Sequence, residues 1–401
     1  MSSPKQAPLW LLTLITFSGT LAMHIFVPAL PQAAHELGAS IGAMQMTMSV
    51  YILGLAVGQL VYGPLSDRYG RRSMLSLGLV IYTVTGVWAI FAPDVHTLIV
   101  VRLLQALGGC AGLVIGRAIV RDTALAREAA RRLAMMNLMV ALGPGTAPLI
   151  GGALTTAFGW RSIFVLLAGL GVLNLLFTWK LLPETKAAVT PDVRSLVRNY
   201  GLLVRSRAFL GYALGGGCAS TSMYGFVAAS PFIFVHELGR PEFEVGLYLA
   251  ILICGIWIGT AAATRLIPIV PTDRLIVCAN LVSVVASLVF LGAALTGHLS
   301  VPTVLGPMVL FAIGVGIASP ASLGQAISIN PNVIGSASGL YGFSQMGVGA
   351  ICTALTSLGS DPARATALVL VGAGAIAQLS FWLAMRRPLP SPPPSPTDAT
   401  R

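Results

Sequence analysis

A histidine in the first apolar run of the chain is well suited to reversible proton binding. Thr13, Thr16, Thr20 and His24 follow one another at steps of 3, 4 and 4 residues along the run. This spacing places the four polar side chains on one face of a helix. Because an imidazole titrates near a pH of about 6.5, His24 could carry a proton. It could also hydrogen-bond a polar ligand, or bridge two helices as a structural residue, and the three roles stay open.

A second ionisable side chain, Arg102, lies inside another apolar run, with Gln105 one turn further along. A charge within such a run is expensive and is commonly kept for function, although a long arginine side chain can also extend to the membrane surface. We expect Arg102 and Gln105 to face the same interior space as His24, with Glu36 as a candidate counter-charge. No aspartate or glutamate lies in the middle of an apolar run.

Other polar and aromatic side chains in the apolar runs are candidates for a ligand-binding surface, and each could equally be a packing residue. Aromatic rings, methionines and amides together suit amphipathic organic molecules. The lack of carboxylates in the middle of the runs favours neutral or anionic ligands over cations. These candidates are Gln45, Tyr51, Gln59, Asn137, Tyr224, Trp257, Gln325, Tyr341 and Gln345.

The stretch GPLSDRYGRR, residues 63–72, places three arginines and one aspartate between two apolar runs. We expect Gly63 and Pro64 to end the preceding helix and Gly70 to allow a tight turn before the next one. The charges would then lie at one mouth of a helix bundle.

Asp67 is the acidic member of this stretch, and it could accept hydrogen bonds from a helix N-terminus or pair with a neighbouring arginine, such as Arg117 or Arg121. Such a cluster could act as a latch that holds one side of the molecule closed. The arginines could instead be ordinary anchors at the membrane surface. The predicted gate comprises Gly63, Asp67, Arg68, Gly70, Arg71, Arg72, Arg117, Arg121 and Asp122.

The elements that must position these residues are transmembrane helices. Hydrophobic residues make up 56% of the 401 residues and charged residues only 9%, too few polar residues to cover a soluble globule. About 20 apolar residues form a helix that crosses the hydrocarbon core. We therefore predict an all-α membrane protein with twelve transmembrane helices. The twelve stretches are 8–30, 42–63, 73–92, 98–120, 133–157, 161–182, 208–235, 244–268, 274–296, 302–327, 333–358 and 363–385.

The distribution of positive charge predicts the orientation. With both termini in the cytoplasm, 19 of the 24 lysines and arginines lie on the cytoplasmic side, and only three lie outside. Short cytoplasmic loops retain such residues, so the asymmetry explains the net charge of +11 without a nucleic-acid partner. The five cysteines all lie in apolar runs without paired spacing, which argues against a disulfide framework or a metal site.

The chain divides near its middle at its longest polar segment, Lys180 to Arg207. Shifting residues 58–68 by 197 positions onto 255–265 aligns one glycine and one arginine, a weak sign of an internal repeat. The predicted divisions are an N-terminal six-helix bundle over 1–182, a central cytoplasmic loop over 183–207, a C-terminal six-helix bundle over 208–387 and a disordered proline-rich tail over 388–401.

Several motifs resemble those of the major facilitator superfamily. Residues 63–72 match its helix-two signature, Gly-x-x-x-Asp-Arg-x-Gly-Arg-Arg, and RLLQALGGCAG at 102–112 resembles its helix-four signature. The motifs that resemble its Bcr/CflA-type drug-resistance branch are RAIVRD at 117–122, FGWRSIF at 158–164 and LPET at 182–185. LGPGTAPLIGG resembles the helix-five signature of exporters, at Gly143, Pro144, Ala147, Pro148, Gly151 and Gly152; the usual glycine is alanine at 147.

The resemblance implies a secondary transporter with two pseudo-symmetric six-helix halves that alternate access to a central site. It implies export of drugs or small amphipathic molecules by proton antiport across a bacterial inner membrane, by a monomer, and a role for the charge cluster in gating the cytoplasmic side. It implies neither bond chemistry nor a cofactor, and the chain has no Gly-x-x-x-x-Gly-Lys phosphate-binding motif.

One departure from the branch concerns His24, because an aspartate usually stands at this position, four residues before Pro28. The proton coupling of the branch therefore does not transfer intact. The alternative is a metabolite exporter or importer, or a uniporter, with the same fold and no proton coupling. A membrane-embedded enzyme or a ligand sensor is a more remote alternative.

Overall fold

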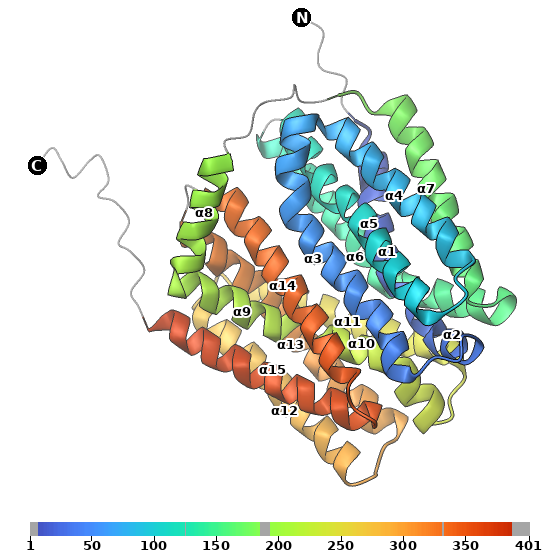
Figure 1. The fold of residues 1–401 in the computed structure, drawn as a ribbon. Coiled ribbons are helices and arrows are strands. Elements are labelled where there is room, and N and C mark those ends of the chain that lie inside the picture. The colour runs from blue at the N-terminus through green and yellow to red at the C-terminus, as the bar shows by residue number, and fades with distance from the viewer. Residues whose placement is uncertain (1–6, 125, 185–192, 331–332, 387–401) are drawn as a thin grey trace, which may run out of the picture.

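The computed structural model describes residues 7–124, 126–184, 193–330 and 333–386, and every regular element in these ranges is a helix (Figure 1). The prediction of an all-α protein is therefore confirmed. The first elements are α1 (Leu9–His24), the 3-10 helix η1 (Val27–Ala29), α2 (Leu30–Glu36), α3 (Ile41–Tyr69), α4 (Arg71–Ile90), α5 (Val95–Thr123), α6 (Ala126–Phe158), α7 (Arg161–Leu181) and α8 (Val193–Arg205). The later elements are α9 (Arg207–Thr221), α10 (Met223–Phe232), the π-helical turn η2 (Ile233–Glu237), α11 (Glu242–Leu266), α12 (Thr272–Leu295), α13 (Val301–Ser328), α14 (Ile334–Thr356) and α15 (Pro362–Met385).

Eleven helices or helix series among the described residues are long and apolar enough to cross a membrane. The remaining predicted stretch, 333–358, corresponds to α14, which has 23 residues. Glycine and serine lower the hydropathy of α14, and they also let it pack closely against α3, α9 and α10. The multi-pass membrane architecture agrees with the sequence prediction.

Five of the described helices begin at a residue whose side chain accepts a hydrogen bond from the first turn, which replaces a missing backbone partner. Ser40 caps α3, Asp94 caps α5, Ser206 caps α9, Ser300 caps α13 and Asp361 caps α15. The backbone N–H bond that Asp94 accepts holds the pKa of this carboxyl below its usual value. These caps fix where the chain enters each span.

The first span of each half is broken, although the sequence predicts continuous helices over 8–30 and 208–235. α1 ends at His24 because Pro28 has no N–H to donate to the His24 carbonyl. In the second half, α9 and α10 meet at an irregular turn on Ser222. The two breaks occupy equivalent positions in the halves, which supports pseudo-symmetry.

α3 continues to Tyr69, so the prediction that Gly63 and Pro64 end this helix is wrong. Proline has a helical φ and removes only one backbone donor, which a helix end outside the core tolerates. The helix stops at Gly70, whose φ of 92° lies in the left-handed region that favours glycine. α4 begins at the next residue, Arg71, so the turn is as tight as predicted.

The helices of each half pack mainly among themselves, and the halves meet where α3 contacts α14 and α6 contacts α11. Figure 1 shows α3 and α14 side by side along the front of the molecule. We call the end that carries the α3–α4 turn the basic end, and the end that carries Glu36 and Arg161 the opposite end.

Two close approaches of backbone to backbone between the halves lie toward the opposite end. A methyl group built on Gly42 of α3 would lie 2.5 Å from the carbonyl oxygen of Ser357. A methyl group built on Gly246 of α11 would lie 2.6 Å from the carbonyl oxygen of Pro148 in α6. Backbone therefore approaches backbone closely in both contacts.

The segment between the halves is not simply a loop, because α8 occupies part of the predicted connection 183–207. α8 contacts α9 and α14, and its Leu203 side chain is buried against the second half. The rest of that connection, 185–192, and the predicted tail, 388–401, lie outside the described residues.

Candidate functional site

His24 lies at the interface between the halves. It is the last residue of α1, and its side chain is only 6% exposed. Its ring centroid lies 6.1 Å from that of Tyr224, with the two planes at 61°. Tyr224 belongs to α10 in the second half. A change in the charge of the imidazole would therefore act between two elements that belong to different halves.

The threonines that share the face of His24 hydrogen-bond to backbone carbonyls. Thr13 and Thr16 donate to Leu9 and Leu12 of their own helix, and Thr20 donates to the carbonyl of Phe17. Thr20 keeps part of its surface exposed one turn before His24. The predicted polar face therefore exists, but its hydroxyl protons are already used.

The Tyr224 ring packs against α14 of the second half. Gly349 leaves room for that ring, since a methyl group built on it would lie 2.9 Å from the tyrosine. One turn away, the Gln345 amide donates to Ser220 at 2.9 Å and to Ser319 at 3.4 Å. Gln345 thus joins α9, α13 and α14 next to the interface, as a partly exposed polar group.

Three other predicted residues lie on α3, α6 and α11, the helices that join the halves. Gln59 donates to the carbonyl of Gly342 in α14 at 3.5 Å. Trp257 of α11 is 39% exposed and lies beside Gly145 of α6. Asn137 is exposed on α6. These positions are compatible with a ligand-accessible surface between the halves.

Two candidates from the sequence lie away from this interface. Gln325 of α13 donates to Asp273 of α12 at 2.9 Å, and Tyr212 of α9 donates to the same carboxylate at 2.8 Å. Tyr341 is buried between α9 and α13, with its hydroxyl against Gly216. Both residues hold the second half together.

Arg102, Gln105 and Tyr51 are placed inside the first half, which corrects the expectation that they face the same space as His24. Arg102 is 0% exposed and donates to the Gln105 amide oxygen at 2.8 Å and to the Ala22 carbonyl at 3.0 Å. Its guanidinium lies 4.0 Å from the centroid of the Tyr51 ring. Helical spacing correctly predicted that Arg102 and Gln105 share a face, but it did not reveal which helices that face contacts.

Glu36 also differs from the expectation, because its carboxylate pairs with Arg161 at 2.7 Å rather than with His24. The same carboxylate accepts a hydrogen bond from the indole N–H of Trp160 at 2.8 Å. Since α2 carries Glu36 beyond the break in the first span, the carboxylate lies at the end of the bundle. It ties α2 to the start of α7.

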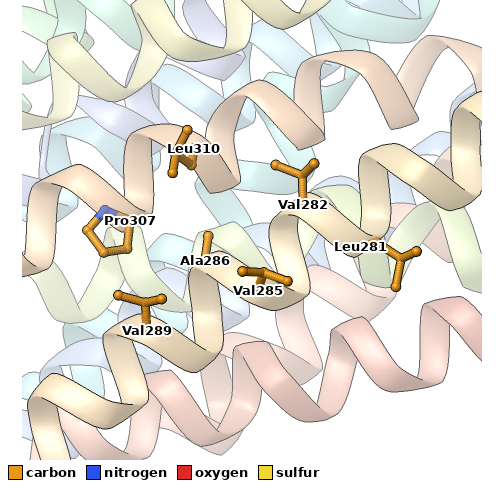
Figure 2. A pocket seen from close by; sticks show the side chains of 7 residues that line it. All are labelled: Leu281, Val282, Val285, Ala286, Val289, Pro307 and Leu310. Carbon is orange, nitrogen blue, oxygen red and sulfur yellow. The ribbon is translucent and has the colours of Figure 1, made fainter.

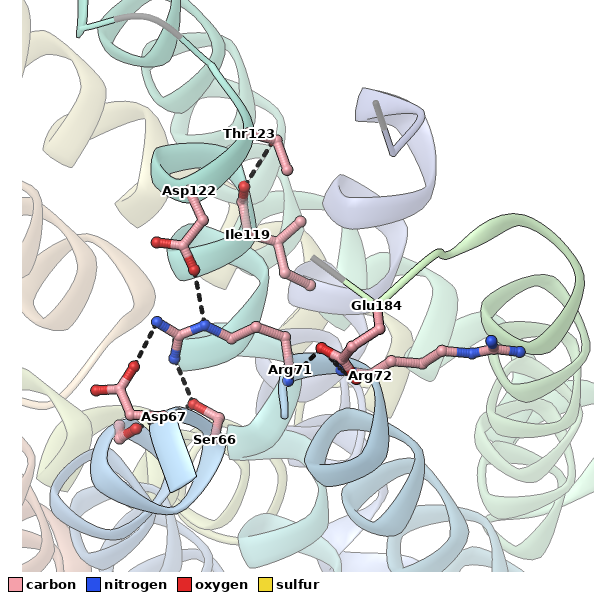
Figure 3. Close-up of polar contacts among 9 residues, drawn as sticks. Ser66, Asp67, Arg71, Arg72, Ile119, Asp122, Thr123 and Glu184 are labelled. Atoms are coloured by element: carbon pink, nitrogen blue, oxygen red, sulfur yellow. Dashed lines mark hydrogen bonds and ion pairs between the residues drawn. The ribbon is translucent and has the colours of Figure 1, made fainter. Parts of the chain in front are cut away.

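At the basic end, the charged residues gather around Arg71 (Figure 3). Its guanidinium lies 2.7 Å from Asp67 and 2.9 Å from Asp122, and it donates to the Ser66 hydroxyl at 2.6 Å. We call these four residues the Arg71 cluster. It joins the end of α3, the start of α4 and the end of α5. The sequence predicts that Asp67 pairs with a neighbouring arginine, for which Arg117 and Arg121 are the examples, and the structure places Arg71 in that role.

Glu184, which was not among the predicted gate residues, completes this region. Its carboxylate accepts hydrogen bonds from the backbone N–H groups of Arg71 at 2.8 Å and Arg72 at 3.2 Å (Figure 3). A carboxylate is favoured at a helix N-terminus, so Glu184 anchors the end of α7 to the start of α4. The acidic residue in LPET, together with a helix start that lacks a capping side chain, was the available signal.

The remaining arginines of the predicted gate lie more on the surface. Arg68 is exposed and stacks on Tyr69, with its guanidinium 5.2 Å from the ring centroid. Arg72 donates to the carbonyl of Trp179 at 2.7 Å. Arg117 and Arg121 are exposed on α5. The positions of Arg68, Arg72 and Arg121 fit the alternative of surface anchors better than a shared latch, whereas Arg117 lies deeper along α5, near Cys110.

The helix-five motif lies where α6 meets α1 and α11. α6 runs through both Pro144 and Pro148 without a break. Gly143 faces the ring of Phe17, and Gly151 packs directly on the carbonyl oxygen of Ile25, at the break after α1. Gly152 faces Phe243 of α11, 3.5 Å from a methyl group built on it. Ala147 is buried in the same helix.

The apolar concavity in Figure 2 is a poor candidate for a polar ligand. It has a volume of about 320 Å³ and lies between α12 and α13. Most of its side chains are exposed on the outer face of the second half, which suits lipid tails. It is lined by Leu281, Val282, Val285, Ala286, Val289, Pro307 and Leu310. In the described part of the chain, no group of three or more His, Cys, Asp or Glu residues could hold a metal ion.

Comparison with known proteins identifies the family. Residues 12–354 match the Major Facilitator Superfamily, across both halves and the helices that carry His24 and the Arg71 cluster. The chain belongs to the major facilitator superfamily. It is therefore a transport protein and not an enzyme, as the sequence predicts.

Relatives include drug-resistance proteins. An uncharacterized MFS-type transporter of Bacillus subtilis is 27% identical over 94% of this chain and 95% of its own length. Multidrug resistance protein D of Escherichia coli is 30% identical, over 83% of this chain and 84% of its own. The bicyclomycin resistance protein homolog of Haemophilus influenzae is 24% identical, over 98% of this chain and its full length. The resemblance to the Bcr/CflA-type branch is thereby confirmed.

Solved structures share the fold at low identity. A D-xylose-proton symporter matches 94% of this chain and 96% of its own, with a TM-score of 0.75 and 14% identity. A bacterial homolog of the human lysosomal transporter Spinster, in an inward-facing occupied conformation, has a TM-score of 0.73 and 18% identity. It covers 94% of this chain and 96% of its own. At these identities the likeness concerns the fold alone.

Proposed function

We propose that this transporter exports drugs or other small amphipathic molecules in exchange for protons. The observation that carries the proposal is the contact of His24 with Tyr224, because it places a titratable ring between the halves. Protonation of His24 would change the charge at that interface and so favour one arrangement of the halves over the other.

Alternating access follows if the halves rock about this interface. The supporting feature is the pair of backbone contacts at Gly42 and Gly246, which close the opposite end in this structure. The Arg71 cluster joins three helices of the first half at the basic end. We propose that the basic end faces the cytoplasm, that residues 1–182 and 208–387 move as the two units, and that a monomer suffices.

The proposed substrate class rests on the charges of the described spans and on the names of the relatives. The names of relatives refer to multidrug and bicyclomycin resistance, which favours export of organic antimicrobials. In the described spans, Asp and Glu lie near helix ends and not at mid-depth. A cation would find no carboxylate there, so neutral or anionic amphipathic molecules fit this chain better.

Proton movement in inside-out vesicles tests the proposal. The lumen is first acidified, a pH-sensitive dye follows it, and neutral, cationic and anionic antimicrobials are added one at a time. We expect release of protons with at least one neutral or anionic compound, and loss of that release in His24→Asn. His35→Asn is the matched control, because His35 is exposed on α2, and it should behave as the unaltered protein.

One alternative is favoured by a specific observation, the histidine in place of the acid that the branch usually carries. A facilitator without proton coupling would move a compound down its gradient and leave the dye signal unchanged. That result would exclude His24 as the proton carrier and retain transport by the same fold. Equal loss of signal in His24→Asn and His35→Asn would also remove the assignment.

A further inference from the structure

Gln45 and Ser49 are buried polar residues of α3 that lack hydrogen-bond partners among the residues that the structure describes. Gln45 is 1% exposed and Ser49 is 4% exposed. In the described part of the chain, neither the nitrogen nor the oxygen of the Gln45 amide has a hydrogen-bond partner, and the Ser49 hydroxyl has none. A buried polar group without a partner loses its hydrogen bonds to water and gains none in return. This loss shifts the equilibrium roughly five- to 150-fold against the conformation that buries the group.

Both residues face the second half. They lie one turn apart, on the side of α3 that also carries Gly42 and Gln59. Gly42 packs on the carbonyl oxygen of Ser357, and Gln59 donates to Gly342, so that side of the helix contacts α14. The opposite side of α3 packs on α5 instead. Gln45 and Ser49 are therefore buried by contact between the halves and not by the core of the first half.

α14 supplies no partner at this level. Because α3 and α14 run antiparallel, Gln45 and Ser49 lie level with the last turns of α14, which contain Thr353 and Thr356. Both threonines are buried, and each donates its hydroxyl to a carbonyl of α14 itself. Among the described residues, no side-chain hydrogen bond therefore joins α3 to α14 at Gln45, Ser49, Thr353 or Thr356.

We propose that Gln45 and Ser49 set the ease with which the opposite end opens. The neighbouring residues Met48 and Ile52 are buried and apolar, and they favour closure. When α3 and α14 separate, water reaches the Gln45 amide and the Ser49 hydroxyl and restores their hydrogen bonds. The free energy of these hydrogen bonds offsets part of the cost of exposing apolar surface, so the closed interface can open again. The inference rests on alternating access in the proposed function.

Hydrogen exchange of the full-length protein in lipid nanodiscs tests this inference. The readout is the exchange rate of backbone amides in residues 41–56 of α3 and 342–357 of α14. Gln45→Met keeps an unbranched side chain of similar length and removes the unpaired amide. We expect exchange in both segments to slow by about tenfold in this variant. Ser49→Ala removes one hydroxyl with no added volume and should slow exchange by about fivefold.

Leu77→Met is the matched control, because Leu77 is 48% exposed on α4, which packs within the first half, and this change should leave exchange in both segments unchanged. Unchanged or faster exchange in both Gln45→Met and Ser49→Ala would overturn the inference. A fold defect in Gln45→Met is recognised because exchange would rise in every segment, and Ser49→Ala then decides. Hydrogen exchange needs neither substrate nor a proton gradient, so the two proposals can fail separately. If exchange slows in the variants but the vesicle assay detects no export, only the proposed function is rejected.

Discussion

Arg102 keeps a positive charge deep inside the first half with only neutral partners among those described. The carbonyl of Ala22 lies in the last turn of α1, where the helix dipole is negative, and it accepts from the guanidinium. The Gln105 amide oxygen and the face of Tyr51 complete the environment. Several weak interactions together therefore replace the single carboxylate that a buried arginine usually pairs with.

Arg71 presents the contrasting case, since it pairs directly with Asp67 and Asp122. We expect Arg71→Gln to lower the free energy of unfolding by about 1.5–3 kcal/mol, the usual worth of a hydrogen bond to a charged group. The lower end of that range is expected because both carboxylates keep partial exposure to solvent. Thermal or SDS-induced unfolding in micelles measures the change.

Arg68→Gln is the control for that change, because Arg68 is exposed and only stacks on its neighbour Tyr69. It should alter stability by less than about 0.5 kcal/mol. Equal losses in the two variants would mean that the number of positive charges at this end, and not the Arg71 cluster, stabilises the fold.

Among the elements, α6 depends on the absence of a side chain at Gly151. A methyl group there would collide with the carbonyl oxygen of Ile25, at the break after α1. We expect Gly151→Ala to cost about 1–3 kcal/mol of stability, because backbone atoms must shift to accept the methyl group. Gly169→Ala is matched to it, since Gly169 is helical in α7 and nothing lies within 4 Å of the added methyl group.

Gly169→Ala should leave stability unchanged or raise it by about 0.5–1 kcal/mol, because alanine is the better helix former. Thermal unfolding of both variants, with transport as a second measurement, checks the pair. If Gly151→Ala unfolds at the same temperature as Gly169→Ala, then α6 does not rely on its contact with Ile25.

The sequence predicted the existence of these elements better than their interruptions. Long apolar runs are sufficient to indicate spans, and all twelve predicted stretches correspond to helices. Pro28 and Pro64 both lack a backbone N–H. The helix breaks before Pro28, after His24, whereas α3 continues through Pro64. Hydropathy does not distinguish these two outcomes.

Across the whole molecule, the orientation is still a prediction and can be measured with reporter fusions. Alkaline phosphatase is active only after export, so a fusion after Gly297, between α12 and α13, should be active. A fusion after Gly70, at the basic end, should be inactive, because the excess of Lys and Arg keeps that end in the cytoplasm. The reverse pattern would invert the topology and the proposed direction of export.

The site also shows which information the sequence lacks. Residue types and spacing selected His24 and Tyr224 separately, 200 positions apart, but only the folded chain brings their rings together. The same spacing selected Arg102, which turned out to face the interior of one half. A helical period gives the face that a residue occupies, and contacts between helices decide what that face meets.

The closure at the opposite end is built largely from glycine against carbonyl oxygen, at Gly42 and Gly246. Any side chain that a mutation adds at either glycine would push the two helices apart. We therefore expect exposed positions between the halves, such as Trp257, to tolerate many side chains, while every substitution at these two glycines acts in one direction only. Among diverging relatives, the lining should drift quickly and the glycines slowly, so that a lineage gains new substrates without redesigning its gate.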